Sequence, residues 1–535
     1  MGDTEGLSTY LRETLMPRDV RVTTGLGLIR VLVGRESLPD VAGSLAGPLG
    51  ARLLTAMGRD RRREHDAYTI HYLFWLPRHR AYVDLVAELP PGDPSFPSLA
   101  ALLPAADWPE REARDLLGLL PVGHPNPGPL LHREGWPPGY YPLRSDAPSM
   151  PPTTVAASEA RIDSAARMGT LIGLTTPPDA SAGHDPNMPA EASAQPGDLD
   201  GGVARRVDTL RLFYGHRGIE RLCEGRSLVA AQALIERVCG SCATAHALAF
   251  CEAIEAAAGI AIPDAACSWR VALLEVERVR AHLGWVGALC AAAGSTGGDS
   301  GATALVEPLL TLTEALTGSR RATGALRPGG LSRAIPTTAA ARAREALRGV
   351  RERWEGVQRS LLHDEALADR LRGRATLPRR TAEHLGVVGP IARAAGLEMD
   401  CRPDDPAGGF AARTSGASGP TRGDAATRLH VHLEEVTAGL RMLEPLLAAA
   451  PAGRHSAPIG RPRTGAQGVG RVEAAEGEHL HWLILGPRLT VERLHIRGAA
   501  YACWPAVLEI LASTVPADRE LDLASFGLCT ACVDR

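Results

Sequence analysis

The pattern of apolar and polar residues changes along the chain, from short strand-like runs near the start to long helical stripes later. Residues 24–33 (TGLGLIRVLV) and 67–76 (AYTIHYLFWL) are apolar runs rich in β-branched and aromatic residues, which predicts two strands. The residues around Leu53, between these runs, predict a helix. Residues 96–146 then combine a short helix with loops rich in Pro and Gly. Residues 1–146 therefore predict a small α/β-sandwich-like domain.

Residues 147–205 differ in kind, because Pro, Ala, Gly, Ser and Asp dominate and leave little apolar surface for a core. We predict a linker here, in which residues 158–174 (SEARIDSAARMGTLIGL) form a modest helix or strand. Beyond the linker, residues 207–215 (VDTLRLFYG) predict a strand, and the segment HRGIE predicts a turn after it.

Helical patterns dominate the next 240 or so residues. Residues 227–238 predict a helix with Ser227 as its N-cap and Gly240 just past its end, and a helix resumes at residues 243–259. Residues 268–294 carry one apolar stripe that predicts core packing, made up of Leu273, Val276, Val279, Leu283 and Val286. A second face of that helix predicts either a solvated surface or a buried network, through Glu275, Arg278 and His282.

Two further helices are predicted at residues 337–362 and 425–449. The loop-like segment between them indicates a buried ion-pair junction at least as much as an active site, since it carries Arg393, Asp400 and Arg402. Residues 479–498 predict a β-hairpin and residues 500–514 a helix. The whole pattern predicts an α+β fold, in which the small domain and the linker precede a large, mainly helical domain with short β-hairpins at residues 206–535.

The amino-acid composition excludes only a few classes of function. The 535 residues carry a net charge of −3, which gives no electrostatic reason to expect nucleic acid or an anionic membrane surface as a partner. Ten Cys are too few for a secreted disulfide scaffold. The first residues show no signal peptide, and no run of about 18 apolar residues predicts a membrane span. These features predict a soluble, cytoplasmic, multidomain protein.

The sharpest chemical signal is two Cys-x-x-Cys motifs that lie far apart, Cys239 with Cys242 and Cys529 with Cys532. Two such pairs suit a metal that prefers soft donors, because each supplies two sulfurs from one turn. Cys242 lies near the start of a predicted helix, where the backbone field favours a thiolate, and Arg237 adds positive charge. The first pair on its own also fits a zinc knuckle or a structural turn. The other six Cys are scattered singly and are predicted to be mostly buried.

The N-terminal residues resemble the C subunit of respiratory complex I and its counterpart in membrane-bound hydrogenases, a module for structure and docking. The matching residues are Ser98, Trp108, Glu110, Arg111, Glu112, Asp115, Gly118, His124, Pro125, Pro142, Leu143 and Arg144. Residues 206–535 resemble the large subunit of [NiFe] hydrogenases, most closely the complex I-related class that includes formate hydrogenlyase. The matching residues are His216, Arg217, Gly218, Glu220, Arg237, Cys239, Gly240, Cys242, His246, Glu275, Glu277, Arg278, His282, Gly318, Arg320, Gly389, Pro390, Arg393, Gly396, Asp400, Arg402, Cys529, Cys532, Asp534 and Arg535.

This resemblance implies a nickel–iron centre held by Cys239, Cys242, Cys529 and Cys532, in which the iron carries cyanide and carbon monoxide. It makes Cys239 and Cys529 terminal nickel ligands and Cys242 and Cys532 bridging ligands. Splitting of dihydrogen releases a proton, which Cys529 takes first and the carboxylate of Glu220 passes on. By itself, Glu220 also fits a salt bridge to Arg217. The residues expected around the metals are Arg217, His246, Glu476, Asp400 and Arg402, and the resemblance adds a magnesium ion near the C-terminus.

The resemblance also implies partners and a location. Electrons would leave through a small subunit that carries an iron–sulfur cluster and is docked against antiporter-like membrane subunits, and a formate or carbon monoxide dehydrogenase module would be a further partner. The chain would then lie on the inner face of the cell membrane. The family removes a C-terminal extension after nickel insertion, and the sequence stops where that cut would fall. Either the extension has been removed or the gene encodes none.

Two departures from the family pattern keep other interpretations open. Gly527 and Leu528 stand where the family has Asp-Pro, and Glu476 stands where an arginine hangs over the open metal position, in EAAEG. An anion in place of a cation changes the electrostatics of the site. The resemblance as a whole still predicts an oxidoreductase of the hydrogenase type. The alternatives are an altered or metal-free structural or quinone-module subunit and a scaffold that holds zinc through the four thiolates.

Overall fold

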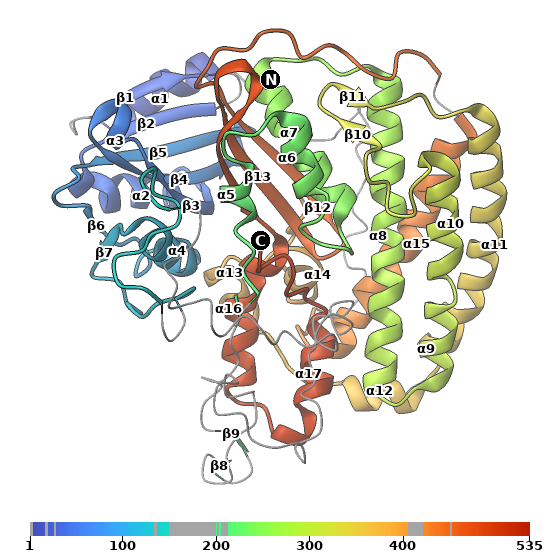
Figure 1. Ribbon diagram of the computed structural model, residues 1–535. Coiled ribbons are helices and arrows are strands. Elements are labelled where there is room, and N and C mark those ends of the chain that lie inside the picture. The colour runs from blue at the N-terminus through green and yellow to red at the C-terminus, as the bar shows by residue number, and fades with distance from the viewer. Residues whose placement is uncertain are drawn as a thin grey trace.

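The computed structural model describes residues 4–15, 20–25, 28–132, 136–148, 199–200, 203–204, 212–213, 215–404, 421–449 and 452–535. The predicted α+β class is confirmed (Figure 1). The helix or strand expected within residues 158–174, and most of the strand expected at residues 207–215, lie outside the described residues. The described residues of the linker include one short pair of strands, β8 (Leu199–Asp200) and β9 (Val203–Ala204).

The N-terminal part, residues 4–148, is built on a five-stranded sheet in the order β1-β2-β5-β4-β3. β2 and β5 run parallel, and every other neighbouring pair is antiparallel. The strands are β1 (Val20–Thr24), β2 (Leu28–Val33), β3 (Arg52–Asp60), β4 (Tyr68–Leu76) and β5 (Ala81–Leu89). The other elements are α1 (Thr4–Leu15), α2 (Leu38–Ala46), α3 (Arg62–His65), β6 (Ser95–Pro97), α4 (Asp107–Leu117) and β7 (Leu120–Val122).

The helix predicted around Leu53 is wrong, because this residue lies in strand β3, and the helix between the two predicted strands is α2. β3 has both faces covered, so six consecutive residues from Leu53 to Gly58 are buried and the alternation that marks a half-exposed strand is missing. A fully buried strand and a buried helix are difficult to distinguish by periodicity alone.

The C-terminal part, residues 212–535, has a three-stranded antiparallel sheet at its centre, β12-β13-β14. The hairpin of β13 (Gly477–Leu485) and β14 (Val491–Arg497) agrees with the sequence pattern. Strand β12 (Gln467–Ala474) was not predicted, because its apolar residues are interrupted by Gly468 and Gly470. Helices follow the sheet toward the end of the chain, α16 (Ala499–Leu511) and α17 (Arg519–Phe526).

Long helices pack beside this sheet (Figure 1). The predicted apolar stripe of α8 is buried along its length. Among the described residues, no helix combines the length and apolarity needed to cross a membrane. The helices are α5 (Ile219–Cys223), α6 (Leu228–Ile235), α7 (Ala243–Ala258), α8 (Asp264–Ala292), α9 (Thr296–Thr303), α10 (Val306–Thr317), α11 (Thr337–Leu362), α12 (Glu365–Leu371), α13 (Arg379–His384), α14 (Gly389–Ala394) and α15 (Ala425–Ala449), with β10 (Leu326–Arg327) and β11 (Gly330–Leu331) as a short hairpin.

The two sheets face each other. Along each strand, successive side chains point alternately toward the other sheet and away from it. On β4, Leu73 and Trp75 point toward the second sheet, whereas Tyr72 and Phe74 belong to the core under the N-terminal helices. On β13, Leu480 and Trp482 meet that layer from the other side. The intervening residues of β13 therefore face the opposite direction, toward α7.

Two glycines set the distance between α7 and the sheet. A Cβ atom on Gly468 or Gly470 of β12 would overlap the backbone carbonyl oxygen of Ala253 or Ala249 in α7. The helix can lie directly on the strand only because both positions lack a side chain. This contact fixes the N-terminal end of α7 relative to β13, and that end carries a cysteine of the first Cys-x-x-Cys motif.

Charged groups also cross the contact between the two parts. Arg52 of β3 lies 2.5 Å from the Glu478 carboxylate of β13, and Arg497 and Arg471 bind the same carboxylate. Burial would raise the pKa of Glu478, but the three guanidinium groups together lower it to about 2. Toward the other end of β3, Arg59 pairs with Glu492 at a more exposed position.

We expect Glu478→Gln to lower the free energy of unfolding at pH 7 by about 3 kcal/mol, because three guanidinium groups lose their shared anion. The contribution of Glu478 is complete above its unfolded pKa, near the reference value of 4.5, and is lost as the pH falls through the folded value of about 2. Urea denaturation at pH 7 and pH 3 should therefore show a smaller difference between variant and wild type at pH 3. Glu492→Gln is the matched control and should change stability by less than about 1 kcal/mol; an equal loss in both variants would contradict this assignment.

Candidate metal centre

The first Cys-x-x-Cys motif lies in the break between α6 and α7. Ser227 caps α6 as predicted, since its side chain accepts a hydrogen bond from the backbone N–H of Ala230. The helix ends at Ile235, earlier than the sequence indicated. Cys242 is the N-cap residue of α7, so its sulfur lies at the positive end of a 16-residue helix. The second motif follows α17, and Figure 1 shows the C-terminal end near the centre of the view.

The fold brings the four cysteines of the two motifs together in the interior. The Sγ atoms of Cys239 and Cys529 lie 3.5 Å apart, and those of Cys242 and Cys532 lie 3.3 Å apart. All four side chains are buried and none forms a disulfide. A disulfide would need about 2.05 Å between the sulfurs, whereas a tetrahedral metal with bonds of about 2.3 Å separates them by about 3.8 Å. The observed spacing fits a shared metal.

Proton affinity in this cluster is uneven. Hydrogen bonds from the thiols of Cys242, Cys529 and Cys532 lower the pKa of Cys239 well below its usual range. The pKa values of the other three thiols are raised, chiefly because each donates a hydrogen bond to Cys239 and further because each is buried beside that thiolate. The first thiolate therefore forms readily, and further ones need a cation beside them.

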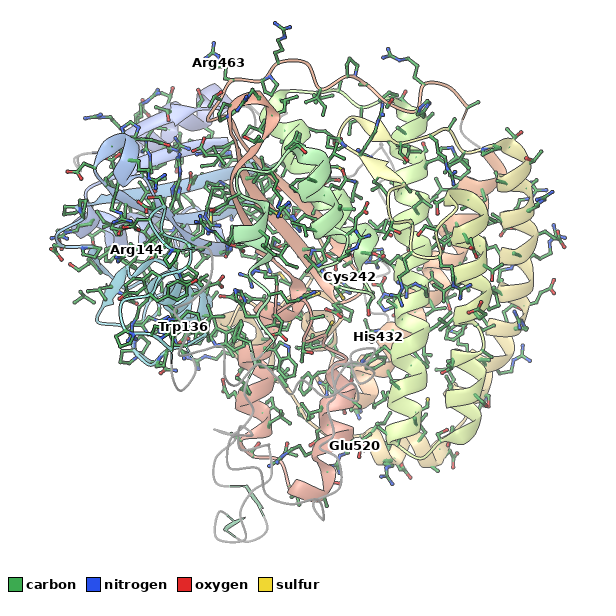
Figure 2. The ribbon with its side chains drawn as sticks, in the orientation of Figure 1. Trp136, Arg144, Cys242, His432, Arg463 and Glu520 are labelled. Carbon is green, nitrogen blue, oxygen red and sulfur yellow. The ribbon has the colours of Figure 1, made fainter. Side chains whose placement is uncertain are left out.

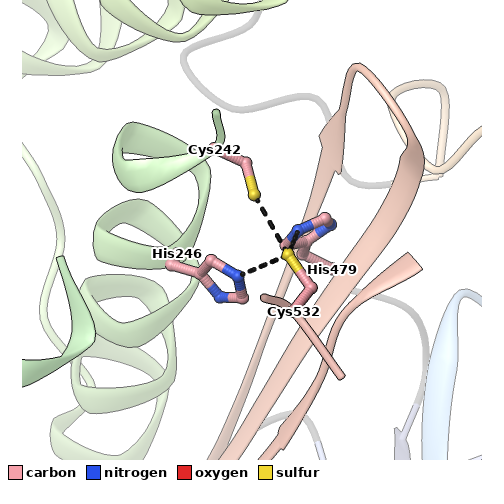
Figure 3. A group of neighbouring side chains, drawn as sticks. All are labelled: Cys242, His246, His479 and Cys532. Atoms are coloured by element: carbon pink, nitrogen blue, oxygen red, sulfur yellow. Dashed lines mark hydrogen bonds between the residues drawn. The ribbon is translucent and has the colours of Figure 1, made fainter. Parts of the chain in front are cut away.

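Two histidines lie beside the sulfur of Cys532 (Figure 3). The Nε2 atom of His246, on α7, lies 3.5 Å from the Sγ atom of Cys532, and Nε2 of His479, on β13, lies 3.9 Å from the same sulfur. The Nδ1 atom of His246 lies 3.0 Å from Nε2 of His481. The Cys242, His246, His479 and Cys532 ligand atoms all fall within 4.8 Å of one another.

Burial keeps these imidazoles neutral. It lowers the pKa of His479 to about 4 and that of His481 to about 3, and it lowers the pKa of His246 well below its ordinary value. His479 and His481 were missed in the sequence. Their spacing of two residues in EHLHW is the signal that could have found them, because it puts both side chains on one face of a strand.

Arg217 ties the two motifs to each other. Its guanidinium donates to the carbonyl oxygens of Arg237 and Val238, which precede Cys239, at 2.9 and 2.6 Å. It also donates to the carbonyl oxygens of Ala531 and Asp534, on either side of Cys532, at 2.7 and 3.0 Å. The salt bridge from Arg217 to Glu220 considered in the sequence is therefore not formed. One cation instead joins segments that are 290 residues apart.

Two more arginines bind carbonyl oxygens of the first motif. Arg280 donates to the carbonyl oxygen of Ser241 at 2.7 Å, and Arg321 donates to that of Gly240. Together with Arg217, they place positive charge around the backbone that carries the sulfurs. Such a ring of cations favours thiolates in the buried cluster.

Glu476, which departs from the family pattern, lies at the tip of the β12–β13 hairpin and is partly buried. Burial and the nearby Cys239 raise the pKa of its carboxyl group well above the usual value, although the backbone amide of Cys529 opposes this. Its Oε2 atom has no hydrogen-bond partner among the described residues. The hairpin tip is held by α14, since a Cβ atom on Gly389 would overlap the backbone of Glu476.

The second departure has a steric reason. Gly527 has a φ angle of +60°, which favours glycine, and a Cβ atom there would overlap the indole ring of Trp285. Trp285 in turn stacks on His432, with ring centroids 3.7 Å apart. Figure 2 shows His432 among the long helices and Cys242 at the side facing the sheet. The aromatic pair thus leaves no room for a side chain at position 527.

Glu220 lies in a network of ion pairs. Arg493 and Arg535 donate to its two carboxylate oxygens at 3.0 and 3.1 Å, and the Nδ1 atom of His495 lies 3.3 Å away. The backbone N–H of Ile496 adds a hydrogen bond of 2.9 Å. Burial would raise the pKa of Glu220, but the charges of His495, Arg493 and Arg535 lower it well below the usual value.

Asp400 and Arg402 contact each other, at 2.5 Å, and not the cysteines. They belong to a buried charge cluster between α8, α14, α15 and β12. The two open interpretations of the α8 polar face are decided in favour of a buried network, because Arg278 pairs with Glu435 at 2.5 Å. The cluster consists of Glu275, Arg278, Arg393, Asp400, Arg402, Glu435 and Glu473.

The donor set decides which metal each group suits. Four cysteine sulfurs and neutral histidines suit a soft or borderline cation such as nickel, iron or zinc. Magnesium would need oxygen donors. Near the C-terminus Glu112, Glu220 and His495 form such a group, but the Arg535 guanidinium already bridges the two carboxylates. These residues therefore do not fit a magnesium ion.

Comparison with known protein families divides the chain into three matches. Residues 31–153 match the respiratory-chain NADH dehydrogenase 30 Kd subunit. Residues 217–292, which include the first Cys-x-x-Cys motif, match the nickel-dependent hydrogenases. Residues 302–464 match the 49 Kd subunit of respiratory-chain NADH dehydrogenase.

Individual relatives cover nearly the whole chain. Formate hydrogenlyase subunit 5 of Escherichia coli (strain K12) is 30% identical over 514 residues, 95% of this chain and 89% of the relative. Hydrogenase-4 component G of the same organism is 30% identical over 534 residues, 98% of this chain and 89% of the relative. Among solved structures, the membrane-bound sulfane sulfur reductase, an archaeal respiratory membrane complex, has a matching chain with a TM-score of 0.56 and 26% identity. That match covers 61% of this chain and 90% of the other.

We expect Arg217→Ala to loosen both cysteine segments, because four carbonyl oxygens lose their shared donor. Hydrogen–deuterium exchange in residues 237–243 and 529–535 should accelerate about tenfold or more. Arg221→Ala is the matched control, since Arg221 pairs only locally with Glu224 on the same short helix region. Unchanged exchange in residues 529–535 of Arg217→Ala would show that the guanidinium does not hold the second motif.

Proposed function

Since the chain belongs to the family of complex I-related [NiFe] hydrogenase large subunits that carry a fused 30 Kd-subunit-like N-terminal part, we propose that it is the large subunit of a membrane-associated hydrogenase complex. The reaction would be the reversible formation and oxidation of dihydrogen. Cys239, Cys242, Cys529 and Cys532 would hold a nickel–iron centre. The chain's membership of an oxidoreductase family supports this proposal.

The observation that carries the proposal is the gathering of four buried, free cysteine thiols from two distant segments. Thiols that close together and shielded from water have little use in a module that only docks partners. They form a set of soft ligands, and the first pair lies in the residues that match nickel-dependent hydrogenases.

A nickel–iron centre with cyanide and carbon monoxide on iron would supply the heterolytic cleavage of dihydrogen. The chain's own residues would hold and move the proton. Cys529 is the proposed first acceptor, and the buried surroundings exclude water from its sulfur. Glu220 is the proposed relay group. His495, Arg493 and Arg535 hold its carboxylate in place and keep it ionised, so it would bind a proton only briefly.

The partners are proposed on the same basis. The relatives are named as subunits of hydrogenase and respiratory complexes, so a small subunit with an iron–sulfur cluster would carry the electrons away. Membrane subunits of the antiporter type would anchor the chain to the inner face of the cell membrane. A formate or carbon monoxide dehydrogenase module would complete the electron path.

A zinc scaffold is the second candidate, and one observation favours it. Cys242, His246, His479 and Cys532 are a Cys₂His₂ set with all ligand atoms within 4.8 Å, a combination that tetrahedral zinc prefers. In that case Cys239 and Cys529 would lie outside the metal site. A metal-free structural or quinone-module subunit is the remaining alternative, and Glu476 in place of the family arginine is the feature that favours it.

Metal content distinguishes these functions. In the complex purified from its native host, we expect about one nickel per chain and one iron beyond the cluster iron of the partners. Infrared bands of cyanide and carbon monoxide should accompany them. Zinc alone would support the scaffold, and an intact complex without metal would rule out the hydrogenase. Cys239→Ser should remove the nickel, whereas Cys223→Ser, at a buried single cysteine outside the cluster, should leave it bound.

Glu476→Arg tests whether the departure from the family weakens the reaction. Burial raises the pKa of Glu476 and so favours its neutral form, and replacing this acid by a cation beside Cys239 changes the local interaction by about 1 to 4 kcal/mol. Hydrogen turnover per bound nickel should therefore rise about tenfold or more. Glu476→Gln, which removes the titratable proton and adds no cation, should stay near the wild-type rate. A variant that binds nickel normally and is slower than wild type would assign the glutamate a productive role.

A further inference from the structure

The side chain of Arg535 connects the two parts of the chain beside the cysteine cluster. It is 1% exposed and donates through Nη2 to both carboxylate oxygens of Glu112, at 2.7 and 2.9 Å. Its Nε atom donates to Glu220 at 3.1 Å. The guanidinium also lies over the ring of Tyr501, 4.6 Å from the ring centroid. Helices α4, α5 and α16 therefore meet on one side chain.

The same side chain lies close in sequence to two proposed metal ligands. Cys532 precedes Arg535 by three residues, and the intervening Asp534 accepts two hydrogen bonds from Arg217 through its carbonyl oxygen. The segment after Gly527 has no helix or strand of its own. Its position is therefore set by its contacts, and the most buried of these charged contacts is the one through Arg535.

Charge explains why this contact is strong. Glu112 and Glu220 bring two carboxylates and His495 within 4.8 Å in a buried place, and the carboxylates would repel each other without a cation. The guanidinium of Arg535 supplies that cation from within the chain. Removing any one of the three charged groups leaves another charge buried without its partner.

We propose that Glu112 is a positioning residue of the metal centre. By binding Arg535, the N-terminal part holds the Cys529–Cys532 segment at the distance from the first motif that a shared metal requires. The N-terminal part then does more than dock partners, because the second pair of ligands is fully ordered only while this part is in place. The proposal holds whichever soft metal the cysteines bind, so it does not rest on the hydrogenase function.

Docking of the N-terminal part and binding of a metal by the two motifs must favour each other equally. If docking of the N-terminal part orders the second motif, a metal bound by both motifs stabilises the docked arrangement by the same factor. The test therefore needs a readout at the cysteines and one at the metal.

Glu112→Gln in the full chain removes the charge and keeps the size of the side chain. We expect iodoacetamide to alkylate Cys529 and Cys532 about tenfold faster or more, the factor that corresponds to the loss of a charge-assisted hydrogen bond. Mass spectrometry gives the rate at each cysteine, with Cys251 in α7 as the internal reference. Binding of Cd²⁺, followed by its thiolate absorbance, should weaken by a similar factor.

Glu110→Gln is the matched control on the same helix. Glu110 accepts hydrogen bonds from Tyr72, Ser98 and the backbone N–H of Leu99, all within the N-terminal part. This variant should lower the melting temperature without changing the alkylation of Cys529 and Cys532. Glu112→Asp, which keeps the charge, should restore most of the protection. Alkylation of Glu112→Gln at the wild-type rate, or a rise that Cys251 shares equally, would overturn the proposal.

Discussion

The structure depends on burying four sulfur atoms that come from segments 290 residues apart. Thiolates confined to one site repel one another, so every surrounding element has to supply compensation. The N-terminal end of α7 and three arginine side chains bound to nearby carbonyl oxygens supply positive charge. His479 and His481 on β13 stay neutral and add no positive charge to the cluster. The sheet holds these groups in place because β12 lacks side chains where α7 crosses it.

Among the described residues, arginine joins several buried polar groups at once, which follows from its geometry. A planar group with five N–H donors can join several carbonyl oxygens or two carboxylates at once. Arg217 uses this for backbone atoms, Arg535 for two carboxylates and Arg278 for the charge cluster of the helices. The chain has no lysine, which offers only a point charge on a flexible stem. The buried polar groups thus form extended networks more than isolated pairs.

The sequence predicted the long helices, the C-terminal hairpin and the pairing of the two cysteine motifs, because each leaves a local periodic or spacing signal. It did not predict the strand at Leu53, since a strand buried on both faces loses its alternation, and it did not predict β12, whose apolar residues are interrupted by two glycines. The ion-pair partners of buried charged residues could not be predicted either. Nothing near Glu220 in sequence indicates that it pairs with Arg493 and Arg535, and nothing near Gly527 indicates that its missing side chain leaves room for a tryptophan 242 positions earlier. Such contacts follow from tertiary packing alone.

The distance between the two motifs along the chain also has a meaning in time. At about 5 to 20 residues per second, a ribosome that has made Cys242 needs about 15 to 60 seconds to reach Cys532. During that interval the first pair of thiols exists without the second, next to His246 of the same helix. Any soft cation that meets the nascent chain then finds half of a ligand set, open to water and free to bind with the wrong geometry. The order of synthesis thus makes the choice of metal a matter of timing as well as of affinity.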